Sequence, residues 1–583
     1  MIFTALKKVK TSIQGPEGTF FRKFKVVKTE HMALPGIFKN HALVWLSIAT
    51  GLLLSASWPA RGLPLLAFVA FIPLLFVEEK MFSDRSRHRS MGFFMHAWLA
   101  FFVWNLLTTW WIMFATLPGM ITAVVINSFL MAIPWWLMHV WRRMHEGRQG
   151  VLPVVVFWLT FEFLHSKWDL SWSWLDLGNV FAAWPRWVQW YEYTGTAGGA
   201  LWVLLVNILL FMLISELLNG KGMPKRVLWF SGLTALMLAV PIGFSLLIGS
   251  RYQERQDPVE VVIIQPSEDP YRDAETGEEA AARTAKMTGL ARAMVTPNTR
   301  FVAAPEAAMP QGIWLHQRSL EPNILQINNF LAEHTGLSWV TGSSTYALYD
   351  TEREASPSAR PLSGSGKFYD AFNSAIMIGP GDHFDVYHKS KLVPGIERMP
   401  FYKALKPIGK LVSSLGGTAG SLGTQEHRSV FRAGEGGPVV APVICYESIY
   451  GDYMTEYIRR GATMIFVLTN DGWWRNTPGH RQHHEYARLR AIEMRRPIVR
   501  AASTGFSSFI DQKGQVLQKT GWWEETSLRE TLNQNQQLTY FALQGNVAGK
   551  ISLFLSILLL LAMVSRKWIR RREKPVIQNK QYN

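Results

Sequence analysis

The sequence predicts a polytopic α-helical membrane domain of about eight transmembrane helices, joined to an external α/β domain. Two observations predict this architecture. Between residues 42 and 250 the chain runs through long, nearly uncharged apolar stretches that are separated by short polar breaks. From residue 251 to about 548 it changes to short β-branched runs with helix-length segments between them, a pattern typical of a sheet covered by helices.

The composition excludes two other classes of protein. Hydrophobic residues make up 48% of the 583 residues and aromatic residues 13%, so the chain would collapse rather than remain disordered. The single cysteine, Cys445, has no partner within the chain, which excludes an intramolecular disulfide scaffold.

Eight apolar stretches are candidates for transmembrane helices, because a bilayer core of about 30 Å takes about 20 helical residues to span. They are residues 42–58, 63–79, 91–116, 119–141, 150–165, 197–218, 228–249 and 550–565. A buried core helix would explain any one of them alone, but the whole series favours membrane spans. The first follows some 40 residues and lacks a small-residue cleavage pattern, so we expect a retained helix and no signal peptide.

The basic residues predict the orientation of these helices. Of the 60 Lys and Arg, 25 lie at the two ends of the chain and in alternate polar breaks, whereas the intervening short loops hold only Arg61, Lys167 and Arg186. Cytoplasmic loops carry an excess of Lys and Arg, so this alternation predicts that both termini are cytoplasmic. The formal net charge of +17 then reflects topology and gives no support to nucleic-acid binding.

An odd number of preceding helices predicts that the α/β domain lies outside the cytoplasmic membrane. The expected divisions are a cytoplasmic segment 1–41, seven transmembrane helices in 42–250, the external domain 251–548, an eighth helix 549–566 and a basic tail 567–583. The external loop 166–196 is rich in Trp and Tyr, which favour the headgroup level of a membrane. This loop is either an interfacial anchor or a wall of a lipid-facing cavity.

Seven short runs in the external domain are predicted strands: 259–265, 300–304, 337–342, 373–379, 442–446, 463–468 and 497–502. Helix-length segments lie between several of them, at 276–294, 317–333 and 480–495. The segment 345–368 is polar and rich in Gly, Ser and Pro, so we expect an exposed excursion, to which the sequence assigns no role.

Three polar residues follow apolar strand runs in this domain: Glu306 after RFVAAP, Lys389 after HFDVYH and Cys445 after PVVAPVI. Each alone has a simpler explanation, a solvated loop residue or, for the cysteine, a small core hydrophobe. Together they form a coherent acyl-transfer centre. The carboxylate takes the thiol proton, the sulfur forms a thioester, and the ammonium lowers the thiol pKa and stabilises the oxyanion.

No metal is needed for this chemistry. His480, His483 and His484 cluster on one expected helix but lack a recognisable ligand spacing, so we expect them to be structural or solvated.

These motifs resemble the nitrilase, or carbon–nitrogen hydrolase, superfamily, whose Glu-Lys-Cys triad matches Glu306 in APEAAMP, Lys389 in YHKSKLVP and Cys445 in ICYES. With seven preceding spans and one following span, nearly the whole chain is similar to the apolipoprotein N-acyltransferases. NDGWW at 470–474 and the run at 487–505 match further signatures of that family. The resemblance implies a nitrilase-like α-β-β-α sandwich in the periplasm, carried by a multi-pass protein of the bacterial inner membrane.

The resemblance also implies roles for residues outside the triad. Glu397 is expected to be an orienting carboxylate, and Tyr446 and Glu447 are expected to support the site. The chain departs from the family pattern at Ala304, where the family usually has Trp, and at Gly472, where it often has Ala.

The implied reaction is a two-step acyl transfer in lipoprotein biosynthesis. Cys445 takes the sn-1 acyl chain of a phospholipid as a thioester, and the α-amine of the N-terminal S-diacylglyceryl-cysteine of an apolipoprotein then accepts it. No cofactor is implied. We expect a monomer whose partners are the phospholipid donor, the apolipoprotein acceptor and the membrane, without nucleic acid.

Two other functions remain open on the sequence. A membrane-anchored amidase or nitrilase would form the same acyl-enzyme and hydrolyse it with water, although an anchor needs only one span. A transporter or lipid-binding protein with an inactive external domain would line a pathway with ionisable residues. The spans hold few of these, mainly His96 and Glu162.

Overall fold

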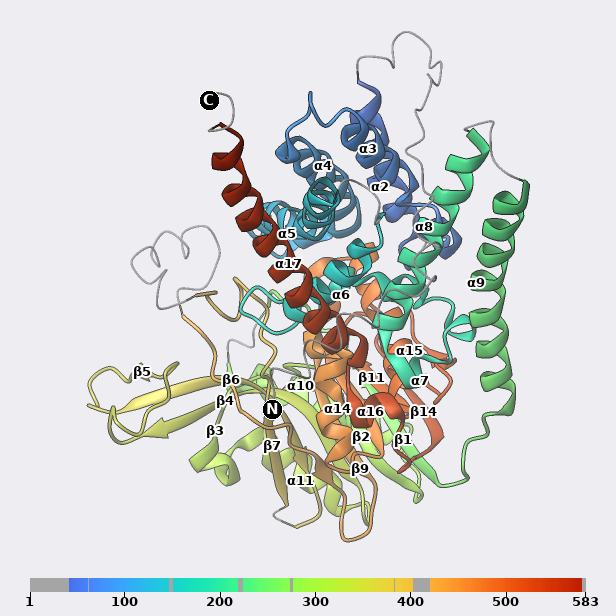
Figure 1. Cartoon of the computed structure of the whole chain (residues 1–583). Coiled ribbons are helices and arrows are strands. Elements are labelled where there is room, and N and C mark those ends of the chain that lie inside the picture. Colours follow the sequence, from blue (N-terminus) through green and yellow to red (C-terminus); the bar gives the residue numbers. More distant parts are fainter. Residues whose placement is uncertain are drawn as a thin grey trace, which may run out of the picture.

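The computed structural model of the chain describes residues 41–60, 62–145, 150–218, 224–272, 276–381, 383–401 and 420–578. The predicted cytoplasmic segment 1–41 lies outside the described residues except for its last residue, as do residues 579–583 of the basic tail. A bundle of apolar helices stands on an α/β domain, and the last helix ends on the side of the bundle away from the sheets (Figure 1).

Five helices of the described residues are long and apolar enough to cross a bilayer. They are α4 (Ser90–Thr109, continued by the 3-10 helix η4, Trp110–Phe114), α5 (Leu117–Met144), α8 (Thr196–Leu218), α9 (Pro224–Arg251) and α17 (Val547–Gln578). Each coincides with one of the eight predicted spans.

The other three predicted spans differ from single full-length helices. α2 (Ala42–Ser57) and α6 (Pro153–His165) are apolar, but they have only 16 and 13 residues. The stretch 63–79 is broken into the 3-10 helix η3 (Pro64–Phe68) and α3 (Ile72–Ser83). Pro73 lies in the first turn of α3, and because proline has no N–H to donate to a preceding turn, the two pieces do not join.

Asn207 of α8 satisfies the backbone groups that this break leaves without helical partners. Its Oδ1 accepts from the Phe71 N–H at 2.8 Å, and its Nδ2 donates to the Ala67 carbonyl at 2.7 Å. In hydrocarbon an unsatisfied backbone group costs several kcal/mol, so a break is tolerated only where the protein supplies such partners.

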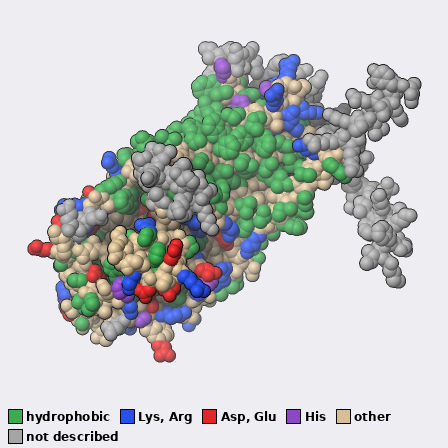
Figure 2. Space-filling model, turned by 90° about the vertical axis from the view of Figure 1, so that its left-hand side faces the viewer, with side chains coloured by type: hydrophobic (Ala, Val, Ile, Leu, Met, Phe, Trp, Pro, Cys, Tyr) green, Lys and Arg blue, Asp and Glu red, His purple; other side chains and the backbone are tan. Residues whose placement is uncertain are grey.

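A broad hydrophobic surface covers the helical part of the molecule, whereas charged side chains gather on the α/β domain and at the opposite end (Figure 2). On α9 alone Leu228, Leu236, Val240 and Phe244 are exposed. The end of α8, the start of α9 and the end of α17 lie at the end opposite to the sheets (Figure 1). A surface of this kind suits contact with lipid.

The α/β domain contains two sheets. The first has the order β14-β1-β2-β4-β6-β5, with β3 beside β4 and β7 beside β6. Its strands are β1 (Pro258–Gln265), β2 (Thr299–Ala303), β3 (Ile313–Trp314), β4 (Ser338–Tyr349), β5 (Arg360–Pro361), β6 (Phe368–Ile378), β7 (Phe384–His388) and β14 (Thr526–Asn533).

The second sheet has the order β13-β12-β11-β10-β9-β8. Its strands are β8 (Phe431–Arg432), β9 (Val439–Ile444), β10 (Met464–Thr469), β11 (Ile498–Ala502), β12 (Ser508–Ile510) and β13 (Val516–Lys519). Every predicted strand run overlaps a strand of one sheet or the other. The segment 345–368 is less irregular than expected, because β4 continues through Tyr349 and β5 forms within it.

The two sheets pack face to face and helices cover their outer faces, which confirms the α-β-β-α sandwich. Along β1, Val261 and Ile263 pack against the second sheet, whereas Val262 and Ile264 pack among residues of α10 (Gly277–Arg292) and α11 (Pro322–Ala332). This alternation is what a strand buried on both faces requires. The short helix α16 (Tyr540–Gln544) leads into α17.

The outer face of the second sheet is covered by α14 (Gly451–Arg459) and α15 (Pro478–Met494). Ala487 and Ala491 of α15 pack in the core of the sheet, whereas Tyr486 and Leu489 pack in the core of the membrane bundle. A helix buried from both sides fixes the α/β domain against the bundle.

Candidate active site

The structure brings the three sequence-predicted residues Glu306, Lys389 and Cys445 to one place from three strand ends. Glu306 lies in the loop after β2, Lys389 directly follows β7, and Cys445 directly follows β9. β2 and β7 belong to the first sheet and β9 to the second, so the site lies where the two sheets meet.

The Glu306 carboxylate is buried and accepts three hydrogen bonds. Oε1 accepts from Lys389 Nζ at 3.0 Å and from Asn373 Nδ2 at 2.8 Å, and Oε2 accepts from the backbone N–H of Asn470 at 3.0 Å. Gly342 of β4 permits this loop to pack closely, because a Cβ there would lie 2.5 Å from the Glu306 Cα. The acid is therefore held in one orientation.

The Lys389 ammonium lies between two carboxylates and is 1% exposed. Nζ donates to Glu306 Oε1 at 3.0 Å and to Glu397 Oε1 at 2.9 Å. Burial lowers the pKa of Lys389, but Glu306 and Glu397 outweigh this effect and hold the pKa well above its ordinary value. Lys389 is therefore a permanent cation at the site.

Cys445 begins the 3-10 helix η10 (Cys445–Ile449) with a φ of +45°, in the left-handed region that residues other than glycine seldom adopt. Burial raises the pKa of the Cys445 thiol well above its ordinary value, and Glu306 raises it further, against a lowering by Lys389. The sequence suggested a thiol activated by a lowered pKa, and this is wrong for the resting protein. The thiol keeps its proton until a base removes it.

Glu397 joins the site as the resemblance implied. Its Oε1 accepts from Lys389 and from Asn373 Nδ2 at 3.1 Å, and its Oε2 accepts from the Val393 N–H at 2.7 Å. Asn373 of β6 thus bridges the two carboxylates, and sequence reasoning missed it. The only signal was its position at the start of a predicted strand run.

Glu447 lies beneath the site, fully buried, and ties its two halves together. Oε1 accepts from the Tyr387 and Tyr453 hydroxyls at 2.6 and 2.8 Å and from the Ser390 N–H at 2.8 Å. Oε2 accepts from the Ile444 N–H at 3.0 Å. One carboxylate thereby fixes the residue after Lys389 and the residue before Cys445.

Tyr446 links the nucleophile turn to the membrane domain. Its hydroxyl donates to the Ser171 carbonyl at 2.8 Å, and the Tyr450 hydroxyl donates to the same oxygen at 3.0 Å. The Trp172 ring lies beside Tyr446, with ring centroids 6.1 Å apart. Part of the aromatic loop 166–196 therefore packs on the site.

The three histidines of α15 lie in different surroundings. His480 packs on the Trp522 ring, His484 contacts Ser508 Oγ at 3.1 Å, and His483 contacts the Cys445 carbonyl at 3.2 Å. Among the residues that the structure describes, no group of three or more His, Cys, Asp or Glu is arranged to hold a metal ion. The contact of His483 with the nucleophile was not foreseen from the sequence.

The sequence matches two protein families along its length. The family described as apolipoprotein N-acyltransferase N-terminal domain matches residues 50–209, and the carbon-nitrogen hydrolase family matches residues 268–537. The first match lies in the helical bundle and the second in the α/β sandwich.

Curated relatives extend the similarity over nearly the whole chain. The apolipoprotein N-acyltransferase of Chlorobaculum tepidum is 28% identical over 535 residues, which cover 90% of this chain and 97% of the relative. That of Geobacter metallireducens is 25% identical over 516 residues, covering 86% and 91%. Among solved structures, a nitrilase-superfamily protein of Saccharomyces cerevisiae covers 48% of this chain and 90% of its own, with 15% identity and a TM-score of 0.33.

Proposed function

We propose that this chain, which belongs to the apolipoprotein N-acyltransferase family, transfers the sn-1 acyl chain of a phospholipid through Cys445 to the α-amine of an N-terminal S-diacylglyceryl-cysteine. It is a membrane acyltransferase. The observation that carries the residue-level mechanism is the Glu306–Lys389 ion pair beside a buried Cys445, in a turn bonded to the membrane loop.

In the first step Glu306 takes the proton of the Cys445 thiol as the sulfur bonds to the ester carbonyl carbon. Lys389 has three N–H donors, and two of them are used by Glu306 and Glu397. The third remains for the oxyanion of the tetrahedral intermediate. The ester C–O bond then breaks, and Glu306 returns the proton to the leaving oxygen, which frees a lysophospholipid.

In the second step the neutral α-amine of the acceptor attacks the thioester carbon. Glu306 takes a proton from the amine, the C–S bond breaks, and the proton returns to the sulfur. The product is an amide, and Cys445 is again a thiol. Glu397 acts through Lys389 and keeps the ammonium in place during both steps.

The distribution of basic residues supports a specific location and orientation in the cell. We place the protein in the bacterial inner membrane, with the α/β domain in the periplasm, because the basic breaks and termini then face the cytoplasm. The divisions at 41, 250, 548 and 566 belong to this proposal. A monomer that binds phospholipid and apolipoprotein, and no nucleic acid, completes it.

The two ionisable residues that the sequence offered for a transport pathway, Glu162 and His96, are hydrogen-bonded within the bundle. Glu162 accepts from Trp158 Nε1 and from the Leu177 N–H, both at 2.8 Å, and His96 Nδ1 contacts Ser47 Oγ at 3.0 Å. Both residues therefore have partners within the protein.

Intact-protein mass spectrometry tests the proposal. The full-length chain in detergent should gain the mass of one acyl chain on Cys445 when phospholipid is added, and a diacylglyceryl peptide should remove it as acylated peptide. Cys445→Ala should stay folded and form neither product. Release of free fatty acid without acylated peptide would support the hydrolase, and transfer by the variant would exclude the thioester.

A further inference from the structure

The carbonyl of Cys445 is held by two side chains that are not members of the triad. Its oxygen accepts from Ser448 Oγ at 2.7 Å and from His483 Nε2 at 3.2 Å. A carbonyl oxygen only accepts, so Nε2 is the donor in this contact. Nε2 also lies 2.9 Å from Ser448 Oγ, so the imidazole, the hydroxyl and the carbonyl form one cluster. Both bonds brace a residue whose φ of +45° is unfavourable for a side chain.

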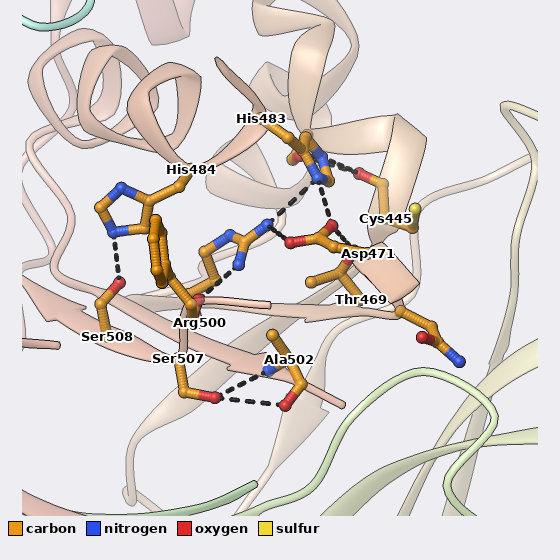
Figure 3. Close-up of polar contacts among 12 residues, drawn as sticks. Cys445, Thr469, Asp471, His483, His484, Arg500, Ala502, Ser507 and Ser508 are labelled. Atoms are coloured by element: carbon orange, nitrogen blue, oxygen red, sulfur yellow. Dashed lines mark hydrogen bonds and ion pairs between the residues drawn. The ribbon is translucent and has the colours of Figure 1, made fainter. Parts of the chain in front are cut away.

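His483 is itself oriented by a buried ion pair (Figure 3). Its Nδ1 lies 3.0 Å from Asp471 Oδ1, and Asp471 Oδ2 accepts from Arg500 Nη2 at 2.7 Å. Arg500 Nη2 also lies 3.1 Å from His483 Nδ1. Asp471, His483 and Arg500 are all 0% exposed. Indole rings of Trp174 and Trp474 pack on the imidazole.

A second arm runs from the same carboxylate toward the sulfur. Thr469, the last residue of β10, donates from Oγ1 to Asp471 Oδ1 at 2.9 Å. The same hydroxyl reaches the Cys445 side chain; having one hydrogen, it stabilises a thiolate only by turning that hydrogen from Asp471 to the sulfur, which lowers the pKa of the thiol against the effect of burial. Thr469 is fully buried, so no water replaces its hydroxyl there.

We propose that Asp471 is the hub of a positioning network that holds Cys445 ready for reaction, with His483 acting on the carbonyl and Thr469 on the sulfur. The network rests on the proposed function, because it concerns Cys445 as the nucleophile. His483 and Thr469 are positioning residues, because each acts through its contact with Cys445. The proposal gives the histidine a role for which its spacing on α15 gave no signal.

Substituting His483 by Gln or by Asn distinguishes its contact with the Cys445 carbonyl from its contact with Asp471. In His483→Gln the amide nitrogen reaches the position of Nε2 and keeps the bond to the Cys445 carbonyl, whereas in His483→Asn it reaches only the position of Nδ1. We expect His483→Asn to lower the rate of acyl-adduct formation on Cys445 at least about tenfold with an unchanged KM, and His483→Gln to stay within about threefold.

His484 supplies the matched control. It is the next residue of α15 and equally buried, but it bonds Ser508 and points away from Cys445 (Figure 3). His484→Asn and His484→Gln should form the adduct at rates like each other's. The positioning role is wrong if His483→Asn and His483→Gln also form the adduct at equal rates. It is equally wrong if the adduct rates of the four His483 and His484 variants simply follow their unfolding temperatures.

Alkylation of Cys445 tests the second arm without any substrate. Thr469→Val should move the pH profile of iodoacetamide labelling to higher pH, and Thr469→Ser should restore it. Thr463 directly precedes β10 and also carries a buried hydroxyl, so Thr463→Val serves as the control and should leave the profile unchanged. An unmoved profile in Thr469→Val would exclude this arm. Because labelling needs no acyl transfer, absence of an adduct in the wild type would count against the proposed function alone.

Discussion

The Tyr446 hydroxyl donates a 2.8 Å hydrogen bond to the carbonyl of Ser171, although 275 residues separate the two in sequence. Ser171 belongs to the loop between α6 and α8, and Tyr446 is the residue after the nucleophile. The bond therefore fixes the position of Cys445 relative to the helical bundle, and the proposed reaction takes both of its lipid substrates from the membrane around that bundle.

Removing this anchor should require two substitutions. Tyr446→Phe leaves the Tyr450 hydroxyl on the same carbonyl, so we expect a loss of about 1 kcal/mol of stability and modest loss of transfer. The double variant with Tyr450→Phe strips a buried carbonyl of both hydroxyls and should cost more than the two single losses together. Urea unfolding in detergent measures the costs, and strictly additive losses would contradict a shared anchor.

The resting thiol should react slowly at neutral pH, because burial and Glu306 raise the pKa of Cys445. A raised pKa leaves little thiolate at pH 7, so iodoacetamide labelling should increase only in the alkaline range. Glu306→Gln removes a negative charge that raises this pKa, so its labelling should start at lower pH while acyl transfer is lost. Lys389→Met should shift labelling the opposite way. Shifts of the same sign in both variants would contradict the electrostatic account.

Glu447→Gln should disrupt both halves of the site at once. The carboxylate accepts from the N–H groups of Ser390 and Ile444 and from two tyrosine hydroxyls. In the glutamine variant an NH2 group replaces one of these oxygens, so a donor would point at another donor. We expect a loss of about 2–4 kcal/mol in the free energy of unfolding, together with loss of acyl-adduct formation. Wild-type stability in this variant would show that the carboxylate is not needed to join the two segments.

Lys391 should make stability depend on pH. Burial first and the nearby Lys167 second lower its pKa to about 8. Between pH 8 and about 10.4, the value in the unfolded chain, the folded state binds fewer protons, so rising pH stabilises the fold through this residue. The unfolding temperature of the wild type should therefore rise relative to that of Lys391→Met as pH goes from 7 to 10. A difference that does not change with pH would contradict the lowered pKa.

The sequence led to Glu306, Lys389 and Cys445 because each follows a run of apolar strand residues, a local pattern. Asn373 and Asp471 could not be found in this way, because their roles depend on which strands lie side by side. Asn373 lies near Glu306 because β4 stands between β2 and β6 and pairs with both strands. The break before Pro73 in the predicted span 63–79 could not be found either, because the hydrophobicity of this stretch conceals it.

The resemblance described above led us to expect Ala at residue 472, and the structure gives a reason for the glycine. A Cβ at residue 472 would lie 2.9 Å from the Pro270 ring and 2.7 Å from Thr504 Oγ1. Gly472→Ala should therefore destabilise the fold by about 1–3 kcal/mol, the usual cost of an overpacked core, and should disturb the neighbouring Asp471.

Pro270→Ala removes the ring atoms that Cβ would meet, so the double variant should recover a large part of the lost stability. Thr504→Ser serves as the control, because it keeps the hydroxyl that opposes the Cβ and should rescue nothing. A double-mutant cycle from urea unfolding measures the coupling, which we expect to exceed about 0.5 kcal/mol in the direction of rescue. A coupling near zero would mean that the Pro270 ring is not the reason why residue 472 must be glycine.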